Sequence, residues 1–218
     1  MEHLNTLIAE VEHELGRLSV SQVWREQASL LIHQPGVGMI GAMTILSGIG
    51  DISRFPTAKQ LVGYAGLGAS IHASGQTYHL GKITKQGRRE LRTALVECAW
   101  IAVQKSEYWR LQFANLVRRM DRKQAITVIA RKLLVSIWYI LSEHKAEKHT
   151  QPQVAARSLM LWVTHYRLAT FLGMTRADFV RQQLAKLGLA DQLEQFTYGA
   201  HTYPMRTSTP TAAYYLTG

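Results

Sequence analysis

One stretch of the sequence constrains the fold more than any other. It is the run of twenty residues that begins at Arg122, "RKQAITVIARKLLVSIWYIL". Its apolar side chains recur at helical spacing on most faces, which is typical of a helix enclosed by other elements. Asp121, directly before it, is a residue type that caps helix N-termini. The longest apolar run, "VSIWYIL", is far too short to span a bilayer. We therefore predict a buried helix from residue 122 at the centre of a mainly α-helical protein that has no membrane segment.

The N-terminal residues show a second helical pattern. Apolar residues are spaced alternately four and three apart, as in the a and d positions of a heptad repeat. The residues are Leu4, Ile8, Val11, Leu15 and Leu18. A helix with so few heptads is too short to form a stable coiled coil alone. It can form half of an antiparallel helical hairpin or a contact in a homodimer, and we predict one of these two roles.

Helical patterns also continue beyond the central stretch. Two segments, "VAARSLMLWVTHYRLATFL" and "TRADFVRQQLAKLGLADQLEQF", follow residue 150, and Thr175 is in position to cap the second. The last residues have no apolar period. We predict a linker helix at 1–31, the main helical domain at 32–148, a helical extension at 149–196, and a loop or disordered tail at 197–218.

Composition narrows the class of protein. The chain has 218 residues, of which 47% are hydrophobic and 18% charged, so it is neither disordered by composition nor a membrane protein. Cys98 is the single cysteine and excludes an internal disulfide, which favours a cytoplasmic location. The nine histidines lack the spacing of paired metal ligands, so we predict no metal site in this chain.

Positive charge is concentrated in two segments. Residues 82–92 contain five basic residues against Glu90, and residues 118–132 contain six against Asp121. Together they account for nine of the net charge of +10. Charge focused in this way is typical of a polyanion-binding protein, although two solvated helix faces would look similar. The candidate nucleic-acid-binding cations are Lys82, Lys85, Arg88, Arg89, Arg92, Arg118, Arg119, Arg122 and Lys123.

A glycine turn at residues 35–38, "PGVG", resembles the turn of a helix-hairpin-helix motif. Gly36 and Gly38 would permit a tight turn and a close approach of the backbone to a ligand. The free N–H groups at the start of the following helix would then face a phosphate without reading sequence. The alternative is a simple joint between two helices.

A glycine-rich loop from Gly66 to Gly81 carries Ser74, which directly precedes a glycine in "ASIHASGQTYHLGKITKQGRRELR". A short hairpin around Gln76–Tyr78 and Lys82–Thr84 is possible within it. A basic helix is predicted to begin at Thr84 or Gly87. On that helix the cations Lys85, Arg88, Arg89 and Arg92 would lie within about 100° of one another. From the residues alone, Ser74 belongs either to an ordinary surface turn or to a site that presents a hydroxyl to a phosphate.

The order and spacing of "PGVG", "GDISRF", "YAGL", "SG", "GKITKQG" and "LR" resemble one family. It is the family of transposases of insertion-sequence one-ten, one-sixteen and nine-oh-two type, which are RNA-guided recombinases. The resemblance runs from about Ile32 to Leu141. It implies that Ser74 is the nucleophile that attacks a DNA phosphate, with DNA as substrate and a guide RNA as partner.

The resemblance also implies a RuvC-like domain whose acidic residues bind a divalent metal such as Mg²⁺. Nothing in this sequence corresponds to that domain, so no cofactor is expected in the chain itself. Three interpretations stay open at this stage. The protein is a fragment or split subunit of a transposase, a non-catalytic nucleic-acid-binding module, or the remnant of a decayed insertion element.

Overall fold

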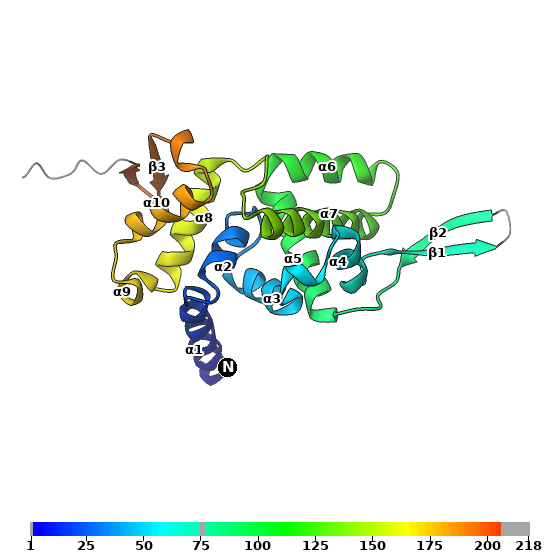
Figure 1. Ribbon diagram of the computed structural model, residues 1–218, viewed down its shortest axis with the longest axis horizontal. Coiled ribbons are helices and arrows are strands. Elements are labelled where there is room, and N and C mark those ends of the chain that lie inside the picture. The colour runs from blue at the N-terminus through cyan, green and yellow to red at the C-terminus, as the bar shows by residue number, and fades with distance from the viewer. Residues whose placement is uncertain (1, 75–76, 206–218) are drawn as a thin grey trace, which may run out of the picture.

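The computed structural model describes residues 2–74 and 77–205, with the backbone alone for Glu2 and for 69–82. Helices form most of it, which confirms the predicted mainly α-helical class. The molecule is elongated, and three parts extend from the helical body: the N-terminal helix, a β-hairpin at one end, and the C-terminal helices at the other (Figure 1).

The centre of the fold is α7 (Arg122–Glu143), as its apolar pattern predicted. It packs against α5 (Arg89–Lys105), α4 (Ala58–Tyr64), α6 (Glu107–Val117) and α2 (Arg25–Ile32). Within the described residues α7 is long and apolar enough to cross a membrane by length and composition, and half of its apolar stretch is buried by these neighbours. Burial in a protein core therefore accounts for its hydropathy.

Several predicted helix boundaries are confirmed, because the side chains that cap them are in place. The Asp121 carboxylate accepts a hydrogen bond from Lys123 N at 2.8 Å. Thr175 Oγ1 accepts one from Asp178 N at 3.1 Å at the start of α10 (Arg176–Lys186). α3 (Met39–Ile49) ends at Gly50, and η1 (Ile52–Arg54) follows it.

A two-stranded antiparallel hairpin replaces most of the predicted glycine-rich loop. Its strands are β1 (Ala69–Ser74) and β2 (Thr77–Ile83). The predicted pairing of Gln76–Tyr78 with Lys82–Thr84 is wrong, because Tyr78 and Lys82 belong to the same strand, β2. Alternating β-branched and aromatic residues such as Ile71 and Tyr78 favour the pairing of β1 with β2. Gly66 and Gly68 precede β1, and Gly81 lies within β2.

The N-terminal helix α1 (Glu2–Ser19) is anchored only near its C-terminal end within the described residues. Ser19 Oγ accepts a hydrogen bond from the Trp162 indole at 3.0 Å, and the Arg17 guanidinium lies 5.2 Å from the centre of the Phe171 ring. Most of the heptad positions are exposed, including Leu4 at 59% and Val11 at 67%. The prediction that α1 contacts a partner helix stays a prediction.

The C-terminal part contains α8 (Pro152–His165), α9 (Leu168–Leu172), α10 and η2 (Ala190–Gln192). The loop predicted from residue 197 is wrong for the part that is described. β3 (Gln195–Tyr198) and β4 (His201–Pro204) form a hairpin that packs on α8. Phe196 is fully buried and stacks on Tyr203 at 5.2 Å, a cross-strand contact that stabilises the pair. The rest of the predicted tail, 206–218, lies outside the described residues.

Candidate nucleic-acid interface

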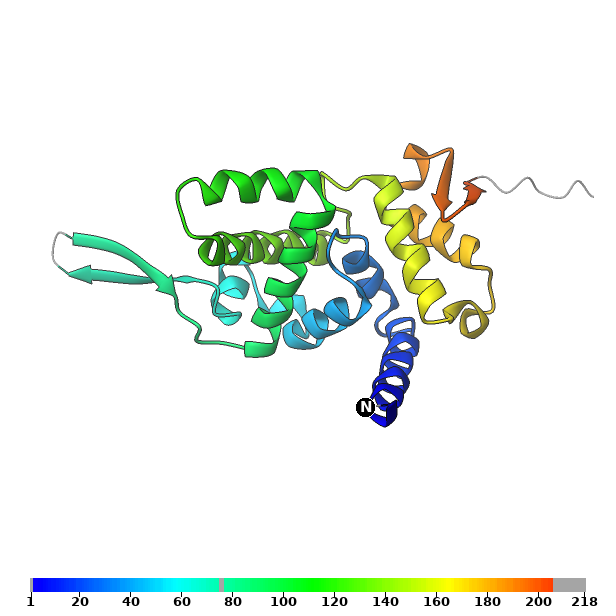
Figure 2. The same ribbon diagram turned by 180° about the vertical axis from the view of Figure 1, so that it is seen from behind.

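Ser74 is the last residue of β1 and pairs with Thr77 of β2. This position lies at the far end of the hairpin, away from the helical body, in both ribbon views (Figure 2). The side chains of Ser74 and Lys82, and Gly75 entirely, lie outside the described residues. The fold therefore separates the candidate nucleophile from the packed core by the length of the hairpin.

The base of the hairpin is attached firmly to α4. Beyond the strands, Thr84 N donates to Gly68 O at 2.9 Å, and Lys85 N donates to Gly66 O at 3.1 Å. Gly87 has a φ of 152°, and a Cβ there would overlap the carbonyl oxygen of Tyr64. The segment "GKITKQG" thus needs its second glycine for a close backbone contact.

The predicted basic helix begins later than the sequence indicated. α5 starts at Arg89, with Arg88 in an extended conformation just before it. Lys85 has a φ of 55°, outside the helical range, and lies in the loop. Contacts between this loop and the end of α4 prevent the helix from extending backwards, so Lys85 and Arg88 do not share a helical face with Arg89 and Arg92.

Two of these cations are held by the fold. Arg88 Nε donates to the Tyr64 hydroxyl at 3.0 Å. Arg92 Nη1 donates to Ala65 O at 3.1 Å, where it satisfies a carbonyl at the C-terminal end of α4. Lys85 and Arg89 are exposed.

The fold brings Arg54, which no sequence pattern singled out, to the same place. Its guanidinium lies 5.5 Å from the centre of the Phe55 ring and 5.8 Å from that of Tyr64. Tyr64 therefore has Arg54 against its ring and Arg88 at its hydroxyl. Arg54 is the arginine of "GDISRF", so the sequence motif already contained it. Because Arg54 and Arg88 are far apart along the chain, the sequence could not show that both contact Tyr64.

The second basic segment surrounds the turn between α6 and α7. Arg118, Arg119, Arg122 and Lys123 are all exposed. Within the described residues none of the four forms an ion pair, and Arg122 lies 5.7 Å from the centre of the Phe113 ring. This turn lies at the same end of the body as the hairpin in both ribbon views (Figures 1 and 2).

The turn between α2 and α3 uses its two glycines differently. Gly36 has a φ of 89°, and a Cβ there would overlap the Cys98 carbonyl oxygen of α5. Gly36 therefore makes its close backbone contact with α5, where the sequence had suggested a ligand. Gly38 precedes α3, and a Cβ there would meet nothing within 4 Å. It lines an open cavity of about 650 Å³ that Arg89 also lines, so this helix N-terminus is accessible.

Two titratable groups near this turn are buried. His33 is fully buried, and burial lowers its pKa to about 4. Its Nε2 accepts a hydrogen bond from Gln34 Nε2 at 3.0 Å, and the ring is neutral at physiological pH. Burial raises the pKa of Cys98 to about 11, so its thiol is protonated and unreactive. Both groups contribute to packing.

No group of three or more His, Cys, Asp or Glu side chains that could hold a metal ion occurs in residues 2–74 and 77–205. The described residues therefore offer cations, aromatic rings and exposed backbone amides. These groups suit contacts with phosphates and with nucleic-acid bases.

Comparison with known proteins relates one segment of the chain to a family. The model of the transposase IS116/IS110/IS902 family matches residues 28–114, from α2 to α6. This segment belongs to that family. It contains the glycine turn, η1, the hairpin and all of α5. The turn between α6 and α7 lies beyond the matched residues.

Individual relatives agree with this family. The pilin gene-inverting protein of Moraxella bovis is 33% identical over 152 residues, which cover 66% of this chain and 46% of the relative. A putative transposase of Sinorhizobium fredii, y4qE, is 36% identical over 46% of this chain and 27% of its own length. The transposase for insertion sequence element IS1111A of Coxiella burnetii is 30% identical over 51% of this chain and 32% of its own length. The chain thus spans less than half the length of these relatives.

Proposed function

We propose that this protein takes part in DNA transposition or site-specific recombination, with Ser74 as the nucleophile. One observation carries the proposal: the segment that belongs to the transposase family includes the whole hairpin, and Ser74 ends its first strand. The names of the relatives, a pilin gene-inverting protein and several transposases, support the general activity.

The proposed reaction is a phosphoryl transfer. The Ser74 hydroxyl attacks the phosphorus of a DNA phosphodiester and forms a phosphoserine bond as one P–O bond to the DNA breaks. The serine proton passes to a base, and the departing DNA oxygen takes up a proton. Because the phosphodiester energy is conserved in the covalent intermediate, a second DNA end can reverse the step without a nucleotide cofactor.

A serine hydroxyl is a weak nucleophile and needs activation. A divalent metal held by a RuvC-like domain would supply it, as the family resemblance implies. This chain's described residues supply positive charge that can contact the DNA backbone away from Ser74. Lys85, Arg89 and the turn between α6 and α7 are exposed at or near the base of the hairpin. We assign them to binding of the DNA backbone.

The partners follow from the same proposal. DNA is the substrate, and a guide RNA is the family-implied partner. The exposed apolar seam of α1 is the proposed contact in a homodimer, since Leu4, Ile8 and Val11 are all more than 40% exposed. A full-length or split transposase subunit would complete the metal site. We propose a cytoplasmic location for these assemblies.

Trapping the covalent intermediate tests the nucleophile. The protein is incubated with labelled insertion-element DNA, Mg²⁺, guide RNA and a RuvC-like domain from a relative, and is then denatured. We expect a labelled protein–DNA adduct with the wild type and the Ser70→Ala control, and none with Ser74→Ala. Ser70 is the matched control because it lies in the same strand. An adduct formed by Ser74→Ala would exclude Ser74 as the nucleophile.

Two other interpretations give different results in the same assay. A non-catalytic binding module would bind the DNA but form no adduct, and Ser74→Ala would bind equally well. A decayed remnant would show weak, salt-sensitive binding without preference among DNA, RNA and junctions.

A further inference from the structure

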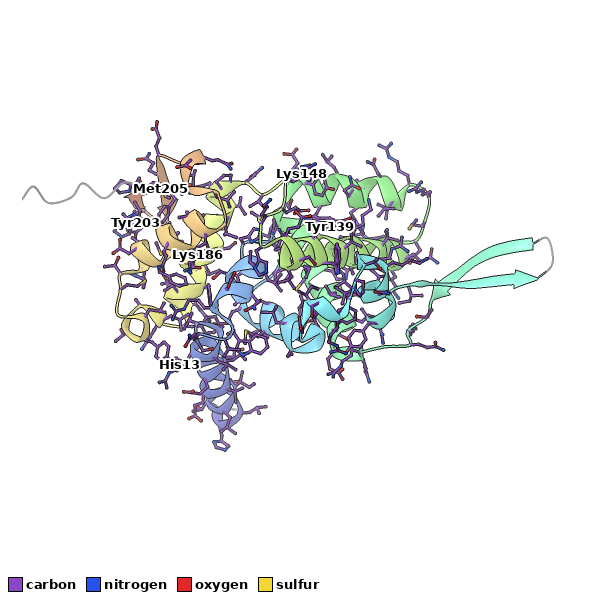
Figure 3. All side chains as sticks on the ribbon, viewed as in Figure 1. His13, Tyr139, Lys148, Lys186, Tyr203 and Met205 are labelled. Carbon is purple, nitrogen blue, oxygen red and sulfur yellow. The ribbon has the colours of Figure 1, made fainter. Side chains whose placement is uncertain are left out.

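A second candidate binding place lies away from the hairpin, along the C-terminal half of α7. A cavity of about 700 Å³ opens there between α6, α7 and the segment 144–149. Tyr139 projects from α7 and Lys148 from the segment after it, both far from the hairpin (Figure 3). This size suits a nucleotide, since small-molecule sites span about 300–1,000 Å³.

Aromatic rings line the cavity on two sides. Tyr108 and His149 stack with their centres 4.5 Å apart, and Trp109 packs edge-on against Tyr108 at 5.0 Å. Tyr139 is 52% exposed although it is a large aromatic side chain. It packs edge-on against Trp138 at 5.0 Å, and the Trp138 indole is fixed by its hydrogen bond to Phe55 O at 2.8 Å. Tyr139 is therefore an exposed ring on a rigid support.

Cations also line the same cavity. Arg131, Lys145 and Lys148 lie among its residues, and none of them forms an ion pair within the described part of the chain. Glu143 and Glu147 reduce the net charge, so the cavity is not a general anion trap. The Ser136 hydroxyl, another lining group, is buried and has no hydrogen-bond partner among the described residues.

We propose that this cavity binds an unpaired nucleotide of a single-stranded nucleic acid. A base would stack on Tyr139 or on the His149 ring, while Lys145 and Lys148 contact the flanking phosphates. Stacking rings beside lysines are the arrangement by which proteins hold single strands without reading their sequence. In a duplex the base faces are already stacked on their neighbours, so this site would not bind paired bases.

The site is independent of Ser74 chemistry and extends the proposed function. Strand exchange exposes unpaired nucleotides, and a guide RNA presents them in loops. DNA and RNA strands share the base faces and phosphates that the cavity would contact. The test therefore uses both.

Fluorescence anisotropy on the full chain tests the proposal, with labelled oligothymidylate, oligouridylate and a duplex of equal length. We expect Tyr139→Ala to weaken binding of at least one single strand about tenfold and to leave duplex affinity unchanged, because a stacked base contributes about 1–3 kcal/mol. Leu161→Ala is the matched control, since Leu161 is a large apolar side chain that is 54% exposed on α8, away from the cavity. The Lys145→Glu/Lys148→Glu variant should weaken the same complexes and flatten their salt dependence.

The ratio of the DNA and RNA affinities identifies the natural strand. Unchanged single-strand affinity in both Tyr139→Ala and Lys145→Glu/Lys148→Glu would overturn the proposal. The Lys85→Glu/Arg89→Glu variant tests the DNA-backbone role assigned above, and we expect it to lose duplex binding. These residues do not line this cavity, so failure of the DNA-backbone role and failure of the nucleotide site give different results.

Discussion

The two basic segments look alike in the sequence, but they differ in the structure. In the first, at 82–92, Arg88 and Arg92 donate hydrogen bonds to the end of α4. In the second, Arg118, Arg119 and Lys123 are exposed, and none of them forms an ion pair within residues 2–74 and 77–205. Similar densities of charge thus serve two purposes. In the first segment Arg88 and Arg92 support the fold, and Lys85 and Arg89 are left exposed. In the second, the exposed cations of the turn are free for a ligand.

Charge density therefore identifies a basic segment but not the role of each cation in it. Arg92 is half-buried against a helix C-terminus, where a cation is favourable without any nucleic acid. Replacing it would loosen the base of the hairpin and would weaken DNA binding indirectly. Substitutions at each kind of position separate these roles.

Gly36→Ala should abolish the packing of the α2–α3 turn on α5. The new Cβ would overlap the Cys98 carbonyl oxygen, and φ at 89° is unfavourable for alanine. We expect the free energy of unfolding to fall by about 3 kcal/mol or more, measured by urea denaturation. Gly38→Ala is the control, because its φ of −83° and open surroundings accept a methyl group. Equal stability of the two variants would show that the turn does not pack on α5 as described.

Acid should destabilise the same region through His33. Its pKa is about 4 in the folded protein, below its ordinary value, so the unfolded chain binds the proton more readily. The stabilisation is present above about pH 6.5 and is lost as the pH falls towards 4, where the loss reaches about 3 kcal/mol.

Denaturation midpoints at pH 7 and pH 4.5 measure the effect of His33. We expect a smaller pH-dependent change in His33→Asn than in the wild type, since the variant has no group that titrates there. The same change in both proteins would show that His33 is not buried in its neutral form.

Arg92→Gln should lower the free energy of unfolding by about 1–2 kcal/mol. It removes the hydrogen bond to Ala65 O in a partly buried position. Arg119→Gln, its counterpart in the second segment, should change stability by less than about 0.5 kcal/mol because Arg119 is exposed. Thermal melts of both variants measure this difference in stability. If Arg92→Gln and the wild type had the same melting temperature, the hydrogen bond to Ala65 O would not stabilise the fold.

Arg118→Gln/Arg119→Gln should have the smallest effect on stability and a clear effect on binding. We expect duplex affinity to fall at low salt and the slope of its salt dependence to decrease by roughly one for each phosphate that the variant no longer neutralises. Arg157→Gln, an exposed arginine on α8, is the control. An unchanged slope in the double variant would show that this turn does not bind the DNA backbone.

Local sequence patterns were enough to predict the central helices, two of their caps and the order of the family motifs. The apolar pattern of α7, the caps Asp121 and Thr175, and the motif order leading to the family are local signals along one segment. Local spacing sets helix periodicity and capping, so these features could be predicted.

Tertiary structure alone decided which charges are free. Arg54 and Arg88 meet at Tyr64, and Gly36 contacts the backbone of α5, through contacts between residues distant in the sequence. The start of α5 at Arg89 has the same origin, because the loop before it is held by α4. Local patterns could not reveal these roles, since each depends on the chain approaching itself in space.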